Sequence, residues 1–222
     1  MRWAACMLFA AAALAGCGGS DEPEGEVSTF AEPDSERWTI GDHPLGRGEL
    51  EPENVAFGPD GLTLTLPEGT TNGGELQGVE YRGSGTFTAR LRSATSPGSI
   101  SAFFLYRHDF DTDSSDELDF EIPGGEPHRV LLTVWRAGTK EPIAQTEVPL
   151  DFDPAADLHD YEFRRDGTDV EFLIDGEQAF TYDDAPTATL QPYFNAWYPE
   201  WQDPTVPPAG GEMVVERYEY AP

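Results

Sequence analysis

Apolar and polar positions alternate with a period of two along most of the chain from residue 30 onward. Such alternation is typical of β-strands with one buried and one solvent-facing side, and no long stretch has the 3.6-residue period of a helix. Turn-forming residues, above all Gly beside Asp, Pro or Ser, separate the segments about every 8–12 residues. The segments with this pattern include 62–66, 86–92, 130–135, 161–163, 170–174 and 213–218. The pattern predicts an all-β sandwich of about a dozen antiparallel strands in one domain, residues 30–222.

The first residues have the composition of a processing signal instead. Arg2 supplies a positive charge, residues 3–13 are apolar, and residues 14–17 read Leu-Ala-Gly-Cys. The apolar run is too short for a bilayer, which needs about 20 residues. Residues 14–17 resemble a bacterial lipobox, in which the signal peptide is cut before the Cys and the Cys then carries the lipid. The alternative is an ordinary secretory signal with an incidental Cys.

The lipobox interpretation divides the N-terminal region into a signal peptide, residues 1–16, and a segment that begins at Cys17. Residues 17–29 are rich in Gly, Ser and acids, which predicts a lipidated Cys followed by a flexible acidic linker. Cys6 is then discarded and Cys17 is capped, so no thiol remains for a disulfide, a metal site or a nucleophile. We expect an exported protein that is lipid-anchored to the cell envelope, at the outer membrane or cell surface, and faces the periplasm or the exterior.

The charge limits the possible partners. Asp and Glu number 42 against 13 Lys and Arg, which gives a formal net charge of −29 at pH 7. This charge repels nucleic-acid phosphates and anionic lipid headgroups, so binding to nucleic acid is excluded and the lipid anchor is the one expected membrane contact. Neutral ligands remain, and we expect a monomer.

Three acids carry the candidate chemistry. In the segment 116–122, Glu117, Asp119 and Glu121 share one face of a strand while the apolar residues between them face the other way. Like charges on one face raise each other's pKa, which is unfavourable unless the acids have a function. The outer Cα atoms lie about 13 Å apart, and inward-leaning side chains could bring the carboxyl groups to the roughly 5–5.5 Å of a retaining glycosidase. The alternative is a solvent-facing acidic strand.

The surrounding sequence resembles glycoside hydrolase family 16, and within it the bacterial lichenases, which are endo-β-1,3-1,4-glucanases. Glu117-Leu-Asp-Phe-Glu121 matches the family's Glu-x-Asp-x-Glu signature, and the resemblance runs along nearly the whole mature domain. The further matching segments are 34–38, 54–57, 61–66, 73–75, 83–90, 101–106, 159–163, 170–176 and 194–197. The resemblance implies a concanavalin-like β-sandwich, a jelly roll of two antiparallel sheets with a concave substrate cleft.

The resemblance also implies roles for individual residues. Glu117 is similar to the nucleophile, Asp119 to its assisting acid and Glu121 to the general acid/base. Aromatic rings suit sugar binding because the C–H faces of a pyranose pack on them, while Asn and Glu bind hydroxyls; the alternative for each ring is core packing. The expected substrate-binding residues are Glu75, Phe104, Tyr106, Trp135, Asn195 and Trp197.

The chain departs from the lichenase pattern in its sugar-binding positions. Ser115 stands where lichenases carry a Trp, Gln77 where an Arg is usual, and Thr133 where an Asn contacts sugar, although Trp135 offers an aromatic surface nearby. We therefore expect a retaining endo-glycosidase acting on a β-1,3-1,4-glucan or related β-glucan, with xyloglucan, laminarin and galactan left open. The alternative is a non-catalytic carbohydrate-binding lipoprotein on the same fold.

No cofactor is expected, and a metal is a minor alternative. The acidic segment 109–116 has Asp at alternate positions, which suits either a solvated loop or a Ca²⁺ site, but it lacks the Gly and terminal Glu of a calcium-binding hand. Glu216 stands near the position of one calcium ligand of lichenase-like proteins. The four histidines have no metal-binding spacing.

Overall fold

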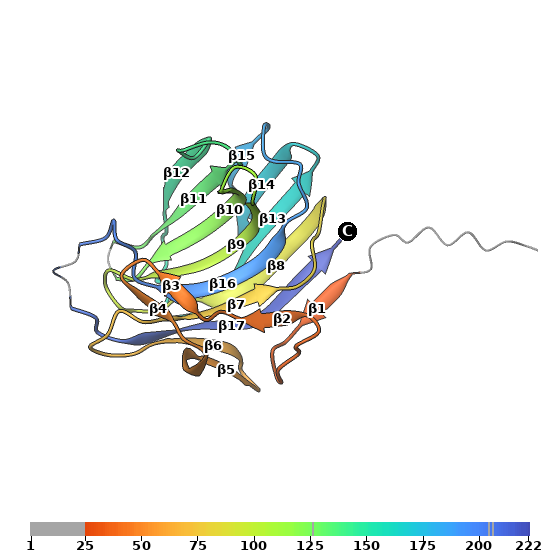
Figure 1. The fold of residues 1–222 in the computed structure, drawn as a ribbon. Helices are drawn as coiled ribbons and strands as arrows, with labels where there is room; N and C mark the ends of the chain where they lie inside the picture. Colours follow the sequence, from red (N-terminus) through yellow and green to blue (C-terminus); the bar gives the residue numbers. More distant parts are fainter. Residues whose placement is uncertain (1–24, 126, 204, 206) are drawn as a thin grey trace, which may run out of the picture.

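Two large antiparallel sheets are stacked against each other in the computed structural model, which describes residues 25–222 except 126, 204 and 206 (Figure 1). The outer sheet contains, in spatial order, β15 (Glu177–Tyr182), β14 (Asp169–Ile174), β13 (His159–Asp166), β8 (Gly85–Arg92), β17 (Gly211–Ala221), β6 (Gly61–Leu66) and β5 (Val55–Gly58), with β1 (Glu26–Ser28) paired to β17. The inner sheet contains β12 (Ala144–Pro149), β11 (Arg129–Trp135), β10 (Ser114–Pro123), β9 (Ile100–Asp109), β16 (Gln191–Trp197), β7 (Gly74–Gly78) and β2 (Trp38–Ile40). The predicted all-β jelly roll is confirmed.

Two small elements complete the described chain. The strands β3 (His43–Leu45) and β4 (Gly48–Leu50) form a separate two-stranded hairpin, and the one described helix is a 3₁₀ turn at Pro52–Asn54. Within the described residues, none of the helical structure is long or apolar enough to cross a membrane. The expected signal peptide and lipidated Cys17 lie outside the described residues.

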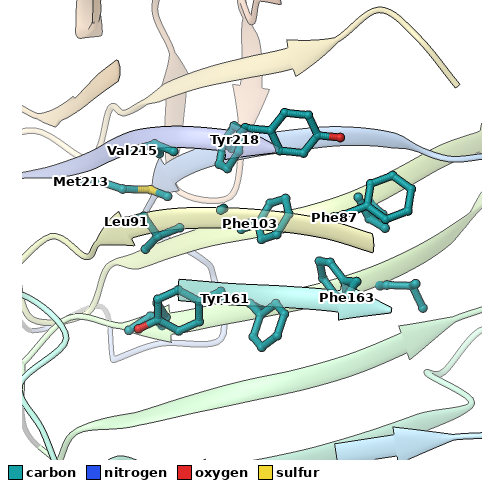
Figure 2. Packing of buried hydrophobic residues seen from close by; sticks show 14 of the residues in the cluster. Phe87, Leu91, Phe103, Tyr161, Phe163, Met213, Val215 and Tyr218 are labelled. Carbon is teal, nitrogen blue, oxygen red and sulfur yellow. The ribbon is translucent and has the colours of Figure 1, made fainter. Parts of the chain in front are cut away.

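The core fills the space between the two sheets. In Figure 2, Phe87 and Phe163 from neighbouring strands of the outer sheet lie close to Phe103 from the inner sheet. Phe103 of β9 lies 5.1 Å from Phe163 of β13 between ring centroids, so the two sheets are joined by aromatic contacts. Along β8, buried side chains alternate with side chains on the face of the sheet that points away from the core. This is the two-residue period from which the strands were predicted.

The strand β10 shows how the core positions the acids. Its side chains Leu118, Phe120 and Ile122 are buried in the core, and Phe120 packs 4.7 Å from Phe163 between ring centroids. Ten consecutive residue pairs join β10 to β9 with no break in register, so the alternation of faces holds along the whole strand. Glu117, Asp119 and Glu121 therefore lie on the opposite, open face of the inner sheet, as predicted.

The number of strands and the start of the domain differ from the sequence-based expectation. The described residues form 17 strands rather than about a dozen. The additional ones are mostly three to six residues long, too short for a period of two to stand out. The folded part begins before residue 30, because Glu26–Ser28 forms β1 beside β17 and Ser28 accepts a hydrogen bond from the Trp38 indole at 3.1 Å.

We predict that Phe120→Ala lowers the free energy of unfolding by about 3–5 kcal/mol, because it leaves a cavity among the rings of Phe103, Phe163 and Phe172. Urea denaturation followed by circular dichroism measures this change. Phe110→Ala is the control, because that ring is 89% exposed and its loss is expected to change stability by less than about 0.5 kcal/mol. A similar small change for both variants would contradict this view of β10.

Candidate active site

The three acids of β10 lie between aromatic and polar residues of the neighbouring strands. Glu117 pairs with Tyr106 on β9 and with Trp135 on β11, while Asp119 pairs with Phe104 and Thr133. The Ser115 hydroxyl, two residues before Glu117 on the same face, donates a hydrogen bond to Glu117 Oε2 at 3.0 Å. The departure at Ser115 thus places a hydrogen-bond donor beside the candidate nucleophile.

Burial and mutual repulsion shift the acids away from their usual ionisation. Burial raises the pKa of Glu117 to about 7, against the hydrogen bonds from Ser115 and Asp119 that lower it. Burial and the charge of Glu117 raise the pKa of Glu121 to about 7. Burial is the largest cause that raises the pKa of Asp119 well above its ordinary value, and the charges of Glu117 and Glu121 add to it. The trio therefore holds fewer than three charges at neutral pH, so a protonated and an ionised carboxyl coexist on one face.

A hollow of about 430 Å³ lies on one side of the acids, over β9, β16 and β7. Five of the six residues expected to bind substrate line it, namely Glu75, Phe104, Tyr106, Asn195 and Trp197. These rings face the open side of the sheet rather than the core. Phe104 is buried in this small cluster, with Tyr106 and Trp197 packed against it. Sugar binding by these rings stays a prediction.

A second hollow of about 450 Å³ lies on the other side of the acids, over β11 and β12. It contains Trp135, the sixth expected residue, together with Thr133 and Trp201, and it shares the three acids and Trp197 with the first hollow. The indole N–H of Trp135 donates to Asp119, which holds the ring beside the acids. The acids therefore lie along the boundary between two hollows of similar size, which together we call the cleft.

Sequence reasoning missed several residues that line the cleft. Tyr193 on β16 lies 5.2 Å from Phe104 and 5.4 Å from Tyr106 between ring centroids. Its position two residues before Asn195 was a usable signal, because both then share a face of one strand. Trp201 and the β3 residue His43 come from a loop and a short hairpin, where no periodic pattern indicates a facing direction.

A polar network surrounds Glu75 in the first hollow. Its Oε1 atom accepts hydrogen bonds from His43 Nε2 at 3.0 Å and from Gln77 Nε2 at 2.5 Å. Its Oε2 atom accepts one from Asn195 Nδ2 at 3.2 Å. Gln77, the second departure from the lichenase pattern, is thus a member of this network.

The candidate calcium segment, residues 109–116, runs from the end of β9 through a turn into the start of β10. Asp109 accepts a hydrogen bond from the backbone N–H of Asp111 at 2.8 Å, and Glu216 pairs with Arg90 at 3.2 Å. Across the residues that the structure describes, no group of three or more His, Cys, Asp or Glu side chains is arranged to hold a metal ion.

Residues 47–204 match the family model described as glycosyl hydrolases family 16, which is more than half of the chain. The chain belongs to glycosyl hydrolases family 16. A β-glucanase of Acetivibrio thermocellus is 27% identical over 164 residues, covering 69% of this chain and 48% of that protein. A β-glucanase of Bacillus subtilis is 30% identical over 147 residues, covering 64% and 59%.

Structural comparison agrees with the family 16 assignment. The β-glucanase of Bacillus licheniformis superposes with a TM-score of 0.79 at 20% identity, covering 89% of this chain and 98% of that one. At this identity the likeness establishes the fold. The chain spans about half the length of the curated relatives that it matches.

We predict that Glu117→Gln stabilises the protein at pH 8 but not at pH 4. An acid whose pKa is raised in the folded state holds its proton more tightly there, so stability falls as the pH rises from about 4.5 through about 7. Replacing Glu117 should therefore raise the free energy of unfolding by about 1–2 kcal/mol at pH 8. Each pKa unit corresponds to about 1.4 kcal/mol, and the partial exposure of Glu117 reduces the total.

Urea denaturation at both pH values measures this difference. Glu177→Gln on β15 is the control, because that residue is exposed and its replacement should have little effect at either pH. Equal stability of wild type and Glu117→Gln at pH 8 would show that the carboxyl group carries no burial penalty.

Proposed function

We propose that this protein is a retaining endo-glycosidase that hydrolyses β-glucosidic bonds in a polysaccharide, most of all a β-1,3-1,4-glucan or related β-glucan. The observation that carries the proposal is a face with three acids between two hollows, on which burial raises the pKa of Glu117 and of Glu121 to about 7. Each hollow can hold a section of a polysaccharide, one on either side of the acids. This supports cleavage within the polymer rather than at its end. The β-glucanases among its relatives support the substrate class.

The proposed reaction has two steps that use the two Glu residues in different protonation states. Ionised Glu117 attacks the anomeric carbon while protonated Glu121 donates its proton to the leaving oxygen, which produces a glycosyl-enzyme and frees the other half of the chain. Glu121, now ionised, then removes a proton from water as that water attacks the anomeric carbon and releases Glu117. The proton of Asp119, which hydrogen bonds to Glu117, orients the nucleophile.

Trp197 supports the binding of a continuous chain. It belongs to both hollows, so its ring borders the sugars on either side of the bond to be cleaved. Aromatic faces bind the C–H faces of glucose units in either part of the cleft. The cleft contains five acids and no Lys or Arg among its described lining residues, which favours a neutral polymer over an anionic one.

The deciding experiment measures reducing-end release from barley β-glucan, laminarin and xyloglucan. Glu117→Gln is expected to lose more than about 1000-fold in rate, because no covalent intermediate can form, while Glu121→Gln loses about 10²–10⁴-fold. The control is Glu147→Gln, on β12 of the same sheet and outside both hollows, with unchanged activity. Proton NMR of the first product should show the β-anomer, and equal activity of Glu117→Gln and wild type would overturn the assignment.

We predict that Asp119→Asn loses less than about 100-fold, because transfer of the proton by Glu121 is retained. Activity should rise as Glu117 ionises and fall as Glu121 loses its proton. Because the hydrogen bond from Asp119 lowers the pKa of Glu117 and an amide is a weaker donor, the acid limb should move to higher pH. An unchanged pH–rate profile would contradict this role of Asp119.

The second candidate function is a carbohydrate-binding lipoprotein without catalysis, which the altered positions Ser115, Gln77 and Thr133 favour. It predicts binding of glucan oligosaccharides by the wild type with no reducing ends released from any of the three polymers. We further propose export and lipid attachment at Cys17, which lies outside the described residues. Mass spectrometry of membrane-extracted protein and of Cys17→Ala tests the attachment.

A further inference from the structure

The hairpin of β3 and β4 closes one end of the first hollow with side chains from a separate small sheet. His43 and Leu45 from β3 line the hollow. The backbone N–H of Gly41 donates to the Glu75 carbonyl at 3.0 Å, and that of Arg47 donates to the Tyr198 carbonyl at 2.9 Å. The hairpin is therefore fastened to β7 just before its first strand, and at its turn to Tyr198, the residue after β16.

The contacts of His43 require protons on both of its ring nitrogens. Nδ1 lies 3.1 Å from the Pro44 carbonyl oxygen, which can only accept a hydrogen bond. Nε2 lies 3.0 Å from Glu75 Oε1, which already accepts a hydrogen bond from Gln77. Two donor nitrogens on one ring describe an imidazolium, so His43 carries a positive charge in this arrangement.

Glu75 needs this charge because it is buried. Its exposed fraction is 3%, and the amide donors of Gln77 and Asn195 satisfy its oxygens without neutralising it. A buried carboxylate is costly unless a positive charge accompanies it. Among the described residues that line this hollow, His43 is the one with a basic side chain.

The orientation of Asn195 follows from Glu75. Its Nδ2 atom donates to Glu75 Oε2, and turning the amide over would place two oxygen atoms against each other. Its Oδ1 atom is buried and makes no hydrogen bond within the described structure, although the residue lines the hollow. An unpartnered buried acceptor at this place is suited to a hydroxyl donor of a bound sugar.

We propose that His43 is a positioning residue of the sugar site: its charge pairs with the buried Glu75 and fixes that side chain, and Glu75 in turn holds Asn195 with its amide oxygen presented to a sugar hydroxyl. The proposal rests on the proposed function in that it takes the first hollow as a glycan site. The proposal assigns a role to His43, which lies outside the Glu-x-Asp-x-Glu motif. It also requires the bound sugar to donate a hydrogen bond from a hydroxyl group to Asn195.

The site should lose this arrangement in alkaline solution. The hydrogen bond with Glu75 raises the pKa of His43 to about 9, with burial opposing it and the Pro44 carbonyl and the charges of Glu75 and Asp42 adding to it. The other titratable groups lining the hollow are Glu117, Asp119 and Glu121 of β10 with Tyr106 and Tyr193. Because the pKa is raised, the contribution of the pair is complete below about pH 6.5 and is lost as the pH rises through about 9.

The test measures binding of a mixed-linkage β-1,3-1,4-glucotetraose to full-length Glu117→Gln protein, in which turnover cannot interfere. We expect Glu117→Gln/His43→Ala to bind about 10-fold more weakly at pH 7, which corresponds to about 1.4 kcal/mol. Glu117→Gln/His43→Gln keeps a hydrogen-bond donor near Glu75 but has no charge there, so its affinity should be intermediate. That affinity should not fall between pH 8 and pH 10. The affinity of Glu117→Gln alone should fall over the same range.

The matched control is His159→Gln on β13, in the other sheet. His159 also pairs with a carboxylate, with Nδ1 at 2.7 Å from Asp175 Oδ2, but it lies outside the cleft. This variant should bind the tetrasaccharide with unchanged affinity and an unchanged pH dependence. An equal loss in the His43 and His159 variants would indicate a general effect on folding and would overturn the proposal.

A second readout separates this proposal from the proposed function. In NMR spectra of the wild type, the side-chain amide of Asn195 should shift as His43 titrates near pH 9, and His43→Gln should abolish that shift. If no glucan is cleaved but this coupling is present, the enzymatic function fails and the positioning role stands. An Asn195 signal that is indifferent to His43, or a His43 pKa near 6.5, would overturn the role of His43.

Discussion

The central constraint in this structure is that one strand faces a dry core on one side and a sugar-sized cleft on the other. On the core side of β10, Leu118, Phe120 and Ile122 are buried between the sheets. On the cleft side, Glu117, Asp119 and Glu121 repel each other and resist ionisation because they are largely shielded from water. The packing of the first set offsets the cost of the second, so the acids remain aligned although their own interactions favour separation.

The cleft is assembled around β10 by segments that are distant in sequence. Register brings Tyr106 and Trp135 to either side of Glu117 from two different strands. Trp197 reaches both hollows from β16, and the hairpin closes one end with a charged histidine against Glu75. Gly46 of this hairpin lies so near that a Cβ atom there would be 2.7 Å from the Trp197 ring, so the hairpin also supports this ring from behind. The proposed binding and catalysis thus depend on one packed unit.

The candidate site could be predicted in part because its strongest signals are local. The acids of β10 stand at every second position, and Glu75, Phe104, Asn195 and Trp197 occupy strands whose alternation or motif identifies their face. Tyr193 obeys the same rule and could have been found. His43 and Trp201 could not, because a three-residue strand and a loop carry no periodic signal and their placement depends on contacts with Glu75 and with the walls of the cleft.

The amino-acid sequence by itself determined that the protein is built from β-strands and that three acids share one face. These properties follow from the two-residue period of an extended chain, which needs no knowledge of neighbours. The tertiary structure alone decided the order of the strands, the pairing of Glu26–Ser28 with β17, the two hollows on either side of the acids and the contact of His43 with Glu75. Each of these depends on pairing and packing between residues far apart in the chain, and a local pattern does not record which partners meet.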